Sequence, residues 1–199
     1  MTKKPAPKTK KKAPAIKKKM ASTSKAKPVK KTTAKKTAVK RKAKVLAIPK
    51  GYSSITPYMI VRKASKAIDF YKKVFGAKEI KRMQKPDGQI GHAELKIGDT
   101  KIMLADECPE SNARSPEAFG GSAMSLHLYV KDVDGITKHA VAAGAKLISP
   151  VQDMFYGDRS GTLTDPFGHT WYVSTHVEDV TPAKMKKRIA EMFKKQSSS

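Results

Sequence analysis

The stretch AIDFYKKVFGAK, residues 67–78, decides how this chain folds. Its apolar residues recur at helical spacing, and Gly76 follows the last of them, where glycine readily adopts the left-handed conformation that ends a helix. The stretch therefore predicts an amphipathic helix that ends at Gly76. The same Gly-Ala-Lys ending recurs at residues 144–146, after a second apolar stripe at helical spacing.

Strand-like segments accompany both predicted helices in the same order, one strand before the helix and three after it. Alternation of apolar and polar residues, interrupted by turns that contain Gly or Pro, marks these segments. The predicted strands are residues 55–61, 79–83, 92–97 and 101–106 in the first half and residues 124–130, 146–150, 160–164 and 170–176 in the second.

The two halves repeat at a nearly constant offset along the chain. Val61 corresponds to Val130, and Gly98 corresponds to Gly168. A repeat that contains the order βαβββ twice indicates an internal duplication. We therefore predict an α+β domain of two modules, at about 54–107 and 123–178, with helices on one face of a mostly antiparallel sheet.

The first 44 residues differ sharply in composition from the rest of the chain. They contain eighteen lysines and one arginine, with no acidic and no aromatic residue, and supply +19 of the formal net charge of +25. Their few small apolar residues do not offset a backbone ordering cost of about 1–2 kcal/mol per residue, so we predict a disordered tail. The predicted organisation is a basic tail (1–44), a globular body (45–180) and a C-terminal segment (181–199).

A flexible polycation binds polyphosphates without sequence preference, because it releases their condensed counterions. The composition of the tail also resembles that of linker-histone tails and of lysine-rich bacterial histone-like proteins. We therefore predict nucleic acid as its partner, with a nuclear-import signal or a solubilising extension as alternatives. The residues expected to contact phosphates are Lys10, Lys11, Lys12, Lys17, Lys18, Lys19, Lys30, Lys31, Lys35, Lys36 and Arg41.

The C-terminal segment predicts a basic amphipathic helix. Thr181 and Pro182 form a capping pair, and an apolar stripe runs from Met185 to Phe193 among lysines and one arginine. This helix either docks its stripe on the body or meets a phosphate or membrane surface.

Cysteine usage and hydropathy indicate the compartment. Cys108 is the single cysteine, which excludes an intramolecular disulfide and fits a reducing environment. No apolar stretch approaches the roughly 18 residues needed to span a bilayer, and the basic N-terminus lacks the apolar segment of a secretory signal. We expect a cytoplasmic, nucleoid-associated protein, nuclear if the organism is eukaryotic, without a membrane partner.

Several motifs of the body together resemble the vicinal oxygen chelate superfamily, which includes glyoxalase I, bleomycin-resistance proteins and extradiol dioxygenases. The motifs are Ala67-Ile68-Asp69-Phe70-Tyr71 with Phe75-Gly76-Ala77, Gly91-His92-Ala93-Glu94-Leu95, Ser125-Leu126-His127-Leu128-Tyr129-Val130, Tyr156-Gly157-Asp158-Arg159 and Asp165-Pro166-Phe167-Gly168-His169. The likeness covers about residues 54–185 and is closest to the branch named after phosphonate-operon protein B. It implies paired modules whose sheets curve around a cleft, usually in a homodimer.

The resemblance also implies where a metal ion would bind, because metalloenzymes of this superfamily take ligands from the first and last strand of each module. In this chain the four positions fall at Thr56, about Leu104, Ser125 and Tyr172. A divalent ion needs imidazole or carboxylate donors, which these residues lack. We therefore expect no metal and no other cofactor.

Strand alternation predicts which side chains line the cleft. Ser125, His127 and Tyr129 alternate with apolar neighbours from Met124 to Val130, so these neighbours should pack under the helices. For each candidate an ordinary structural role is the alternative: packing for the tyrosines, a satisfied hydrogen bond for the histidine, and a cap or ion pair for the charged residues. The candidate ligand-binding residues are His127, Tyr129, Tyr58, Tyr172, Arg159 and Asp106, of which His127 and Asp106 are also candidates for acid–base chemistry.

Three hypotheses on function remain open. The body is a metal-free binder of an unknown small molecule, of the bleomycin-resistance kind, with a tail that binds nucleic acid. Alternatively it is a metal-independent enzyme of lyase or isomerase type, or a dimerising scaffold for a histone-like nucleoid or chromatin protein. The sequence does not decide whether the body is catalytic.

Overall fold

The computed structural model describes residues 45–196, with side chains as far as Lys194. The predicted basic tail and its phosphate-contacting residues, from Lys10 to Arg41, lie outside this range.

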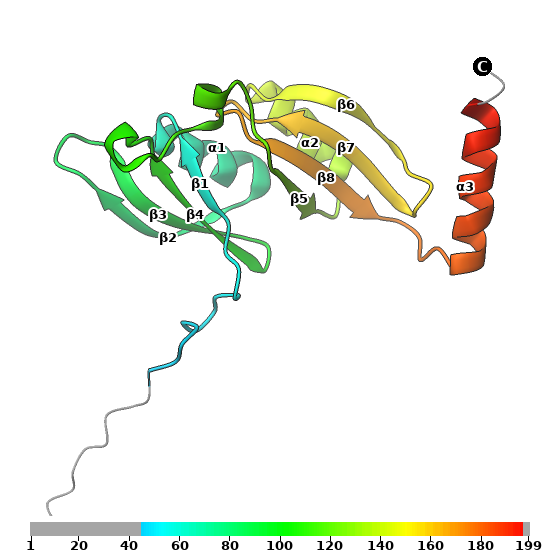
Figure 1. Ribbon diagram of the computed structural model, residues 1–199, viewed down its shortest axis with the longest axis horizontal. Helices are drawn as coiled ribbons and strands as arrows, with labels where there is room; N and C mark the ends of the chain where they lie inside the picture. The colour runs from blue at the N-terminus through cyan, green and yellow to red at the C-terminus, as the bar shows by residue number, and fades with distance from the viewer. Residues whose placement is uncertain (1–44, 197–199) are drawn as a thin grey trace, which may run out of the picture. The chain divides into compact units, whose positions relative to one another are not determined.

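Each half of the body forms its own four-stranded sheet (Figure 1). The first module contains β1 (Tyr58–Val61), α1 (Ala64–Phe75), β2 (Lys78–Gln84), β3 (Ile90–Ile97) and β4 (Thr100–Asp106), in the sheet order β1-β4-β3-β2. The second contains β5 (Ser125–Tyr129), α2 (Val133–Ala142), β6 (Lys146–Asp153), β7 (Asp158–Thr164) and β8 (Thr170–His176), in the equivalent order β5-β8-β7-β6. In each sheet the first and last strands pair in parallel and the other pairs are antiparallel, which confirms the α+β duplication.

Residues 67–75 form most of α1, and the helix ends at Gly76 as predicted. Its apolar stripe from Ala67 to Phe75 is buried, and Gly76 ends the helix at φ 63°. A residue with a side chain is strained at this angle, which explains the glycine. In Figure 1, α1 lies against the sheet of its own module and α2 against the other.

In both modules the last strand caps the helix. Asp106 of β4 accepts hydrogen bonds from the backbone N–H groups of Ala64 at 2.7 Å and Ile90 at 2.7 Å. Thr175, at the equivalent position of β8, accepts one from the N–H of Val133, the first residue of α2, at 3.0 Å. Helix N-termini expose N–H groups that need such acceptors. Asp106 therefore lies on the helix side of its sheet, and the prediction that it lines the cleft is wrong.

An aromatic cluster joins the two modules. The buried Asp165 carboxylate, in the turn before β8, accepts hydrogen bonds from the Tyr71 hydroxyl of α1 at 2.7 Å and from the Trp171 indole at 2.9 Å. Burial and this carboxylate raise the pKa of Tyr71 well above its usual value. We call this arrangement the aromatic clasp; it also contains the rings of Phe70, Phe75 and Phe167.

Glu107 fixes the connection between the modules. Its carboxylate accepts hydrogen bonds from the Ser115 hydroxyl at 2.6 Å and backbone N–H at 2.7 Å, and pairs with Arg62 at 2.7 Å. These contacts, with the Ser115 hydroxyl first, lower the pKa of Glu107 to about 2. They hold a segment that contains only two short 3₁₀ helices, η1 (Pro109–Ser111) and η2 (Pro116–Phe119).

The predicted C-terminal helix forms as α3 (Pro182–Gln196). Arg188 attaches it to the body by bonding the Phe155 carbonyl at 3.1 Å and Glu178 at 2.7 Å. No helix within residues 45–196 has the length and apolar character needed to cross a bilayer.

We predict that Tyr71→Phe lowers the free energy of unfolding by roughly 1.5–3 kcal/mol, the range for a hydrogen bond to a charged group. Urea titration followed by tryptophan fluorescence measures this, because Trp171 lies in the clasp. Tyr172→Phe is the control: Tyr172 is 44% exposed, and a surface change should cost no more than about 0.5 kcal/mol. Equal effects of the two substitutions would contradict the role of the clasp.

Acid should weaken the Glu107 contacts. Since folding lowers the pKa of Glu107 from its usual value to about 2, its stabilising effect is complete above pH 4.5 and is lost as the pH falls toward 2. Between pH 6 and pH 3 the wild type should lose about 1–2 kcal/mol more stability than Glu107→Gln, after allowance for partial exposure. Parallel stability profiles in urea titrations at several pH values would show that Glu107 contributes nothing of this kind.

Candidate functional site

Each sheet has one face against its helix and one open face. In β5, Ser125, His127 and Tyr129 lie on the open face, whereas Leu126 and Leu128 pack against the core, as strand alternation predicts. Met124 departs from the prediction, because it precedes the strand and its side chain is 59% exposed. The open face of the second module therefore presents a histidine and a tyrosine to solvent.

Three predicted site residues come together on this face. His127 of β5 is the register partner of Tyr172 of β8, and their rings stack with centroids 6.1 Å apart. The His127 ring also stacks on Tyr129, with centroids 4.7 Å apart and planes 29° apart. We call these three rings the aromatic ladder. It gives a flat, partly exposed surface suited to stacking against a planar molecule.

Two residues that were not among the candidates extend this ladder. The Tyr129 hydroxyl donates to Asp158 Oδ2 at 2.9 Å, and His176 Nδ1 lies 2.7 Å from Asp158 Oδ1. The hydrogen bond to Asp158, followed by that to Asp179, raises the pKa of His176. The Asp158 carboxylate also raises the pKa of Tyr129. Strand alternation already places His176 on the face of Tyr172, but its pairing with Asp158 depends on a register that the sequence does not give.

Gly157 explains why Asp158 meets His176. Its φ of 102° and its close approach to the chain leave no room for a side chain, since a Cβ would lie 2.1 Å from the Glu178 carbonyl oxygen. The Gly157 carbonyl accepts hydrogen bonds from the N–H groups of Val177 and Glu178, at 3.0 and 2.9 Å. The start of β7 is thereby held against the chain that leaves β8.

Arg159 points to the opposite side of this sheet. Its guanidinium bonds Asp134 of α2 at 2.8 and 2.9 Å and Asp153 of β6 at 3.1 Å, which raises the pKa of Arg159 further above its already high value. The structure thus places Arg159 in a link between helix and sheet and not beside the aromatic ladder. The prediction that it clamps a ligand in the cleft does not fit this position.

The open face of the first module is partly covered by the segment before β1. The Tyr52 hydroxyl donates to Glu94, and the Lys101 ammonium lies 3.6 Å from the centre of the Tyr52 ring. Glu94, only 8% exposed, also contacts His92 at 3.3 Å, and its pKa is lowered chiefly by the bond from Tyr52. Tyr58 lies here, with its hydroxyl 3.4 Å from His92 Nδ1.

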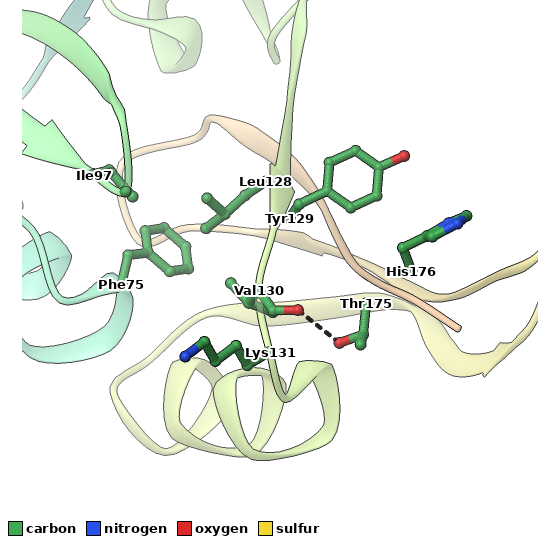
Figure 2. Close-up of a pocket in the computed structure, with 9 residues that line it drawn as sticks. Phe75, Ile97, Leu128, Tyr129, Val130, Lys131, Thr175 and His176 are labelled. Atoms are coloured by element: carbon green, nitrogen blue, oxygen red, sulfur yellow. Dashed lines mark hydrogen bonds between the residues drawn. The ribbon is translucent and has the colours of Figure 1, made fainter. Parts of the chain in front are cut away.

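Cavities flank β5 where it faces the β3–β4 turn of the first module. One, of about 270 Å³, is lined by His127 and Tyr129 together with Pro57, Thr100 and Trp171. The other, of about 570 Å³, is lined by Tyr129 and His176 on the polar side and by apolar residues such as Phe75 (Figure 2). Residues of both modules thus line these cavities.

The strand register tests the four positions implied for a metal ion. Leu104 is fully buried on the helix face, so it cannot contribute to an open-face site. Thr56 precedes β1, and in the second module Ser125 pairs in register with Thr170 and Tyr172 pairs with His127. This set offers a single imidazole and no carboxylate, and no group of three or more His, Cys, Asp or Glu within residues 45–196 is placed to hold a metal ion. These positions therefore supply no donor set of the kind that holds a divalent ion.

Comparisons with known proteins agree with this architecture. "Uncharacterized protein Rv0887c" of Mycobacterium tuberculosis is 38% identical over 130 residues, which cover 64% of this chain and 76% of that protein. The X-ray structure of the Arabidopsis thaliana At5g48480 gene product matches with a TM-score of 0.52 at 26% identity, covering 62% of this chain and 98% of that one. The PhnB protein from Bacillus cereus shares the fold, with a TM-score of 0.50 at 19% identity over 62% of this chain and 99% of its own.

The model of the Glyoxalase/Bleomycin resistance protein/Dioxygenase superfamily matches residues 53–173, which contain all eight strands except the end of β8. The chain belongs to this superfamily.

Proposed function

We propose that the body binds a planar small molecule on the aromatic ladder and does so without a metal ion. The observation that carries this proposal is the stack of His127 between Tyr129 and Tyr172 on an open sheet face. The adjoining cavities offer room for a ligand, and pockets of a few hundred Å³ with a few placed polar groups are typical of small-molecule sites. Membership of a superfamily that includes bleomycin resistance proteins supports a binding role.

A metal-independent reaction of lyase or isomerase type is the second reading of the same site. His127 remains its acid–base candidate, whereas Asp106 is occupied by two backbone N–H groups and has no place in it.

A homodimer also forms part of the proposal, because both open faces carry exposed apolar side chains such as Met83 and Ile148.

Binding can be tested with N-phenyl-1-naphthylamine, an uncharged aromatic fluorophore. Its affinity should fall about two- to tenfold in Tyr172→Ala and in His127→Ala, because each change removes one stacking partner. Phe119→Ala is the matched control, since Phe119 is an exposed ring on the connection between the modules.

A chelator should leave this affinity unchanged, and elemental analysis should find far less than one divalent ion per chain. Equal affinity of wild type and both ladder variants, with folding intact by circular dichroism, would refute ligand binding on the ladder.

We propose separately that residues 1–44 bind nucleic acid. The charge of +19 without an acidic residue supports this partner, and the C-terminal segment adds further basic residues. In the histone-like alternative, DNA binding is the main function and the body serves to dimerise the chain. A ladder that binds no aromatic probe, combined with a dimeric body, would favour that alternative.

For duplex DNA, the full chain should bind without sequence preference and residues 45–199 much more weakly. If about ten cationic groups engage phosphates, the slope of log affinity against log salt should be about −9. Fluorescence anisotropy at several salt concentrations measures both quantities, with two duplexes of unrelated sequence as the control. Unchanged affinity and slope after removal of residues 1–44 would leave the targeting or solubilising alternatives.

A further inference from the structure

The motif Tyr156-Gly157-Asp158-Arg159 and the end of β8 build a second polar element beside the ladder. We propose that His176, held by Asp158, recognises the acidic group of the ligand, so that the ligand class is a planar molecule with a carboxylate, sulfonate or comparable oxyanion. This inference rests on the proposed function, because it assumes that the aromatic part of the ligand lies on the ladder.

Asp158 fixes the orientation and protonation of His176. Its carboxylate is 4% exposed and has a partner on each oxygen, Tyr129 on one and His176 Nδ1 on the other. A buried carboxylate can only accept hydrogen bonds here, so Nδ1 carries a proton. The ring is thereby anchored on one side and directs Nε2 away from Asp158.

The outward-facing Nε2 atom of His176 already contacts an acidic side chain of this protein. His176 Nε2 lies 3.0 Å from Oδ1 of Asp179, whose side chain is fully exposed. An exposed ion pair of this kind contributes little free energy, so a ligand anion can replace it at small cost. The Asp179 carboxylate marks the place where the acidic group of a ligand would bind.

His176 lies on the ladder side of β5. Figure 2 shows Tyr129 and His176 on one side of this strand, whereas Lys131, which lines the same cavity, extends toward the other. The charged and titratable groups around His176 are Asp158 of β7, Tyr129 of β5, and Asp179 in the chain that follows β8. The two carboxylates favour the imidazolium form, which donates from both ring nitrogens and attracts an oxyanion.

A pair of fluorescent probes that differ by one acidic group tests the proposal on the full chain. 8-Anilinonaphthalene-1-sulfonate is N-phenyl-1-naphthylamine with an added sulfonate. Affinity for the sulfonate should fall about tenfold as the pH rises from 6 to 8.5, the scale of one charge-assisted hydrogen bond, while affinity for the uncharged probe should not change. The direction follows because Asp158 and Asp179 raise the pKa of His176, so that the imidazolium present at acidic pH is lost as the pH rises.

Two variants test whether His176 and Asp179 cause the pH dependence of sulfonate binding. His176→Gln should abolish most of the pH dependence for the sulfonate and weaken the uncharged probe much less than the sulfonate at pH 6. Asp179→Asn should tighten the sulfonate about two- to fivefold at pH 6, because the internal competitor is gone. His139→Gln, on exposed α2 surface, is the matched histidine control. Lysines of the tail also attract a sulfonate, but with a pKa of about 10.4 they stay charged throughout and contribute equally to every variant.

The outcomes separate this inference from the proposed function. A pH dependence that persists in His176→Gln would assign it to another group, such as His127, and overturn the proposal; weaker sulfonate binding in Asp179→Asn would also overturn it. If the uncharged probe does not bind the wild type, the proposed function fails. Loss of sulfonate binding in His176→Gln would then still support the anion site.

Discussion

The hydrogen bonds of the buried Asp165 carboxylate hold the body together as one unit. One oxygen receives the Tyr71 hydroxyl and the Trp171 indole, and the other receives the backbone N–H groups of Phe167 and His169 in its own turn. Four donors satisfy a charge that would otherwise be costly to bury. His169 adds a contact between modules through the Ile60 carbonyl of β1, at 3.1 Å. Because these contacts set the position of β5 beside the β3–β4 turn, the cavities next to the ladder depend on them.

The two open faces differ in what covers them. In the first module, the Tyr52 hydroxyl donates a hydrogen bond to Glu94, and the Lys101 ammonium lies over the Tyr52 ring. In the second, no described residue is hydrogen bonded to the Tyr172 hydroxyl, and His176 meets only exposed Asp179 on its outer side. The duplicated scaffold thus offers one face that its own chain partly covers and one that remains more open. The chemistry of the second face, stacked rings that end at an anchored histidine, favours ligands with an aromatic part and an acidic part.

Local patterns predict the elements of this fold well. The stripe of α1, the glycine that ends it and the repeat of the two halves are all visible in the order of the residues, so the duplication and the ladder face of β5 follow directly. Asp106 was misplaced because alternation shows that it shares a face with Leu104 but not which face the helix covers. The contact of Asp158 with His176 cannot be predicted from the sequence because it depends on the register between β7 and β8. The position of Arg159 cannot be predicted because its partner Asp134 lies on a helix 25 residues earlier in the chain.

The turn that contains Asp165 also makes the two modules non-equivalent. The β3–β4 turn consists of Gly98 and Asp99, whereas the equivalent connection between β7 and β8 runs from Asp165 to His169 and brings in the residues that grip α1. The counterpart of Tyr71 in α2 is Ala140, which has no hydroxyl to offer such a turn. These contacts therefore join the turn of the second module to the helix of the first, without an equivalent in the reverse direction. Two copies of either half would lack one side of these contacts, so a symmetric pair of identical modules would lose the hydrogen bond between Tyr71 and Asp165.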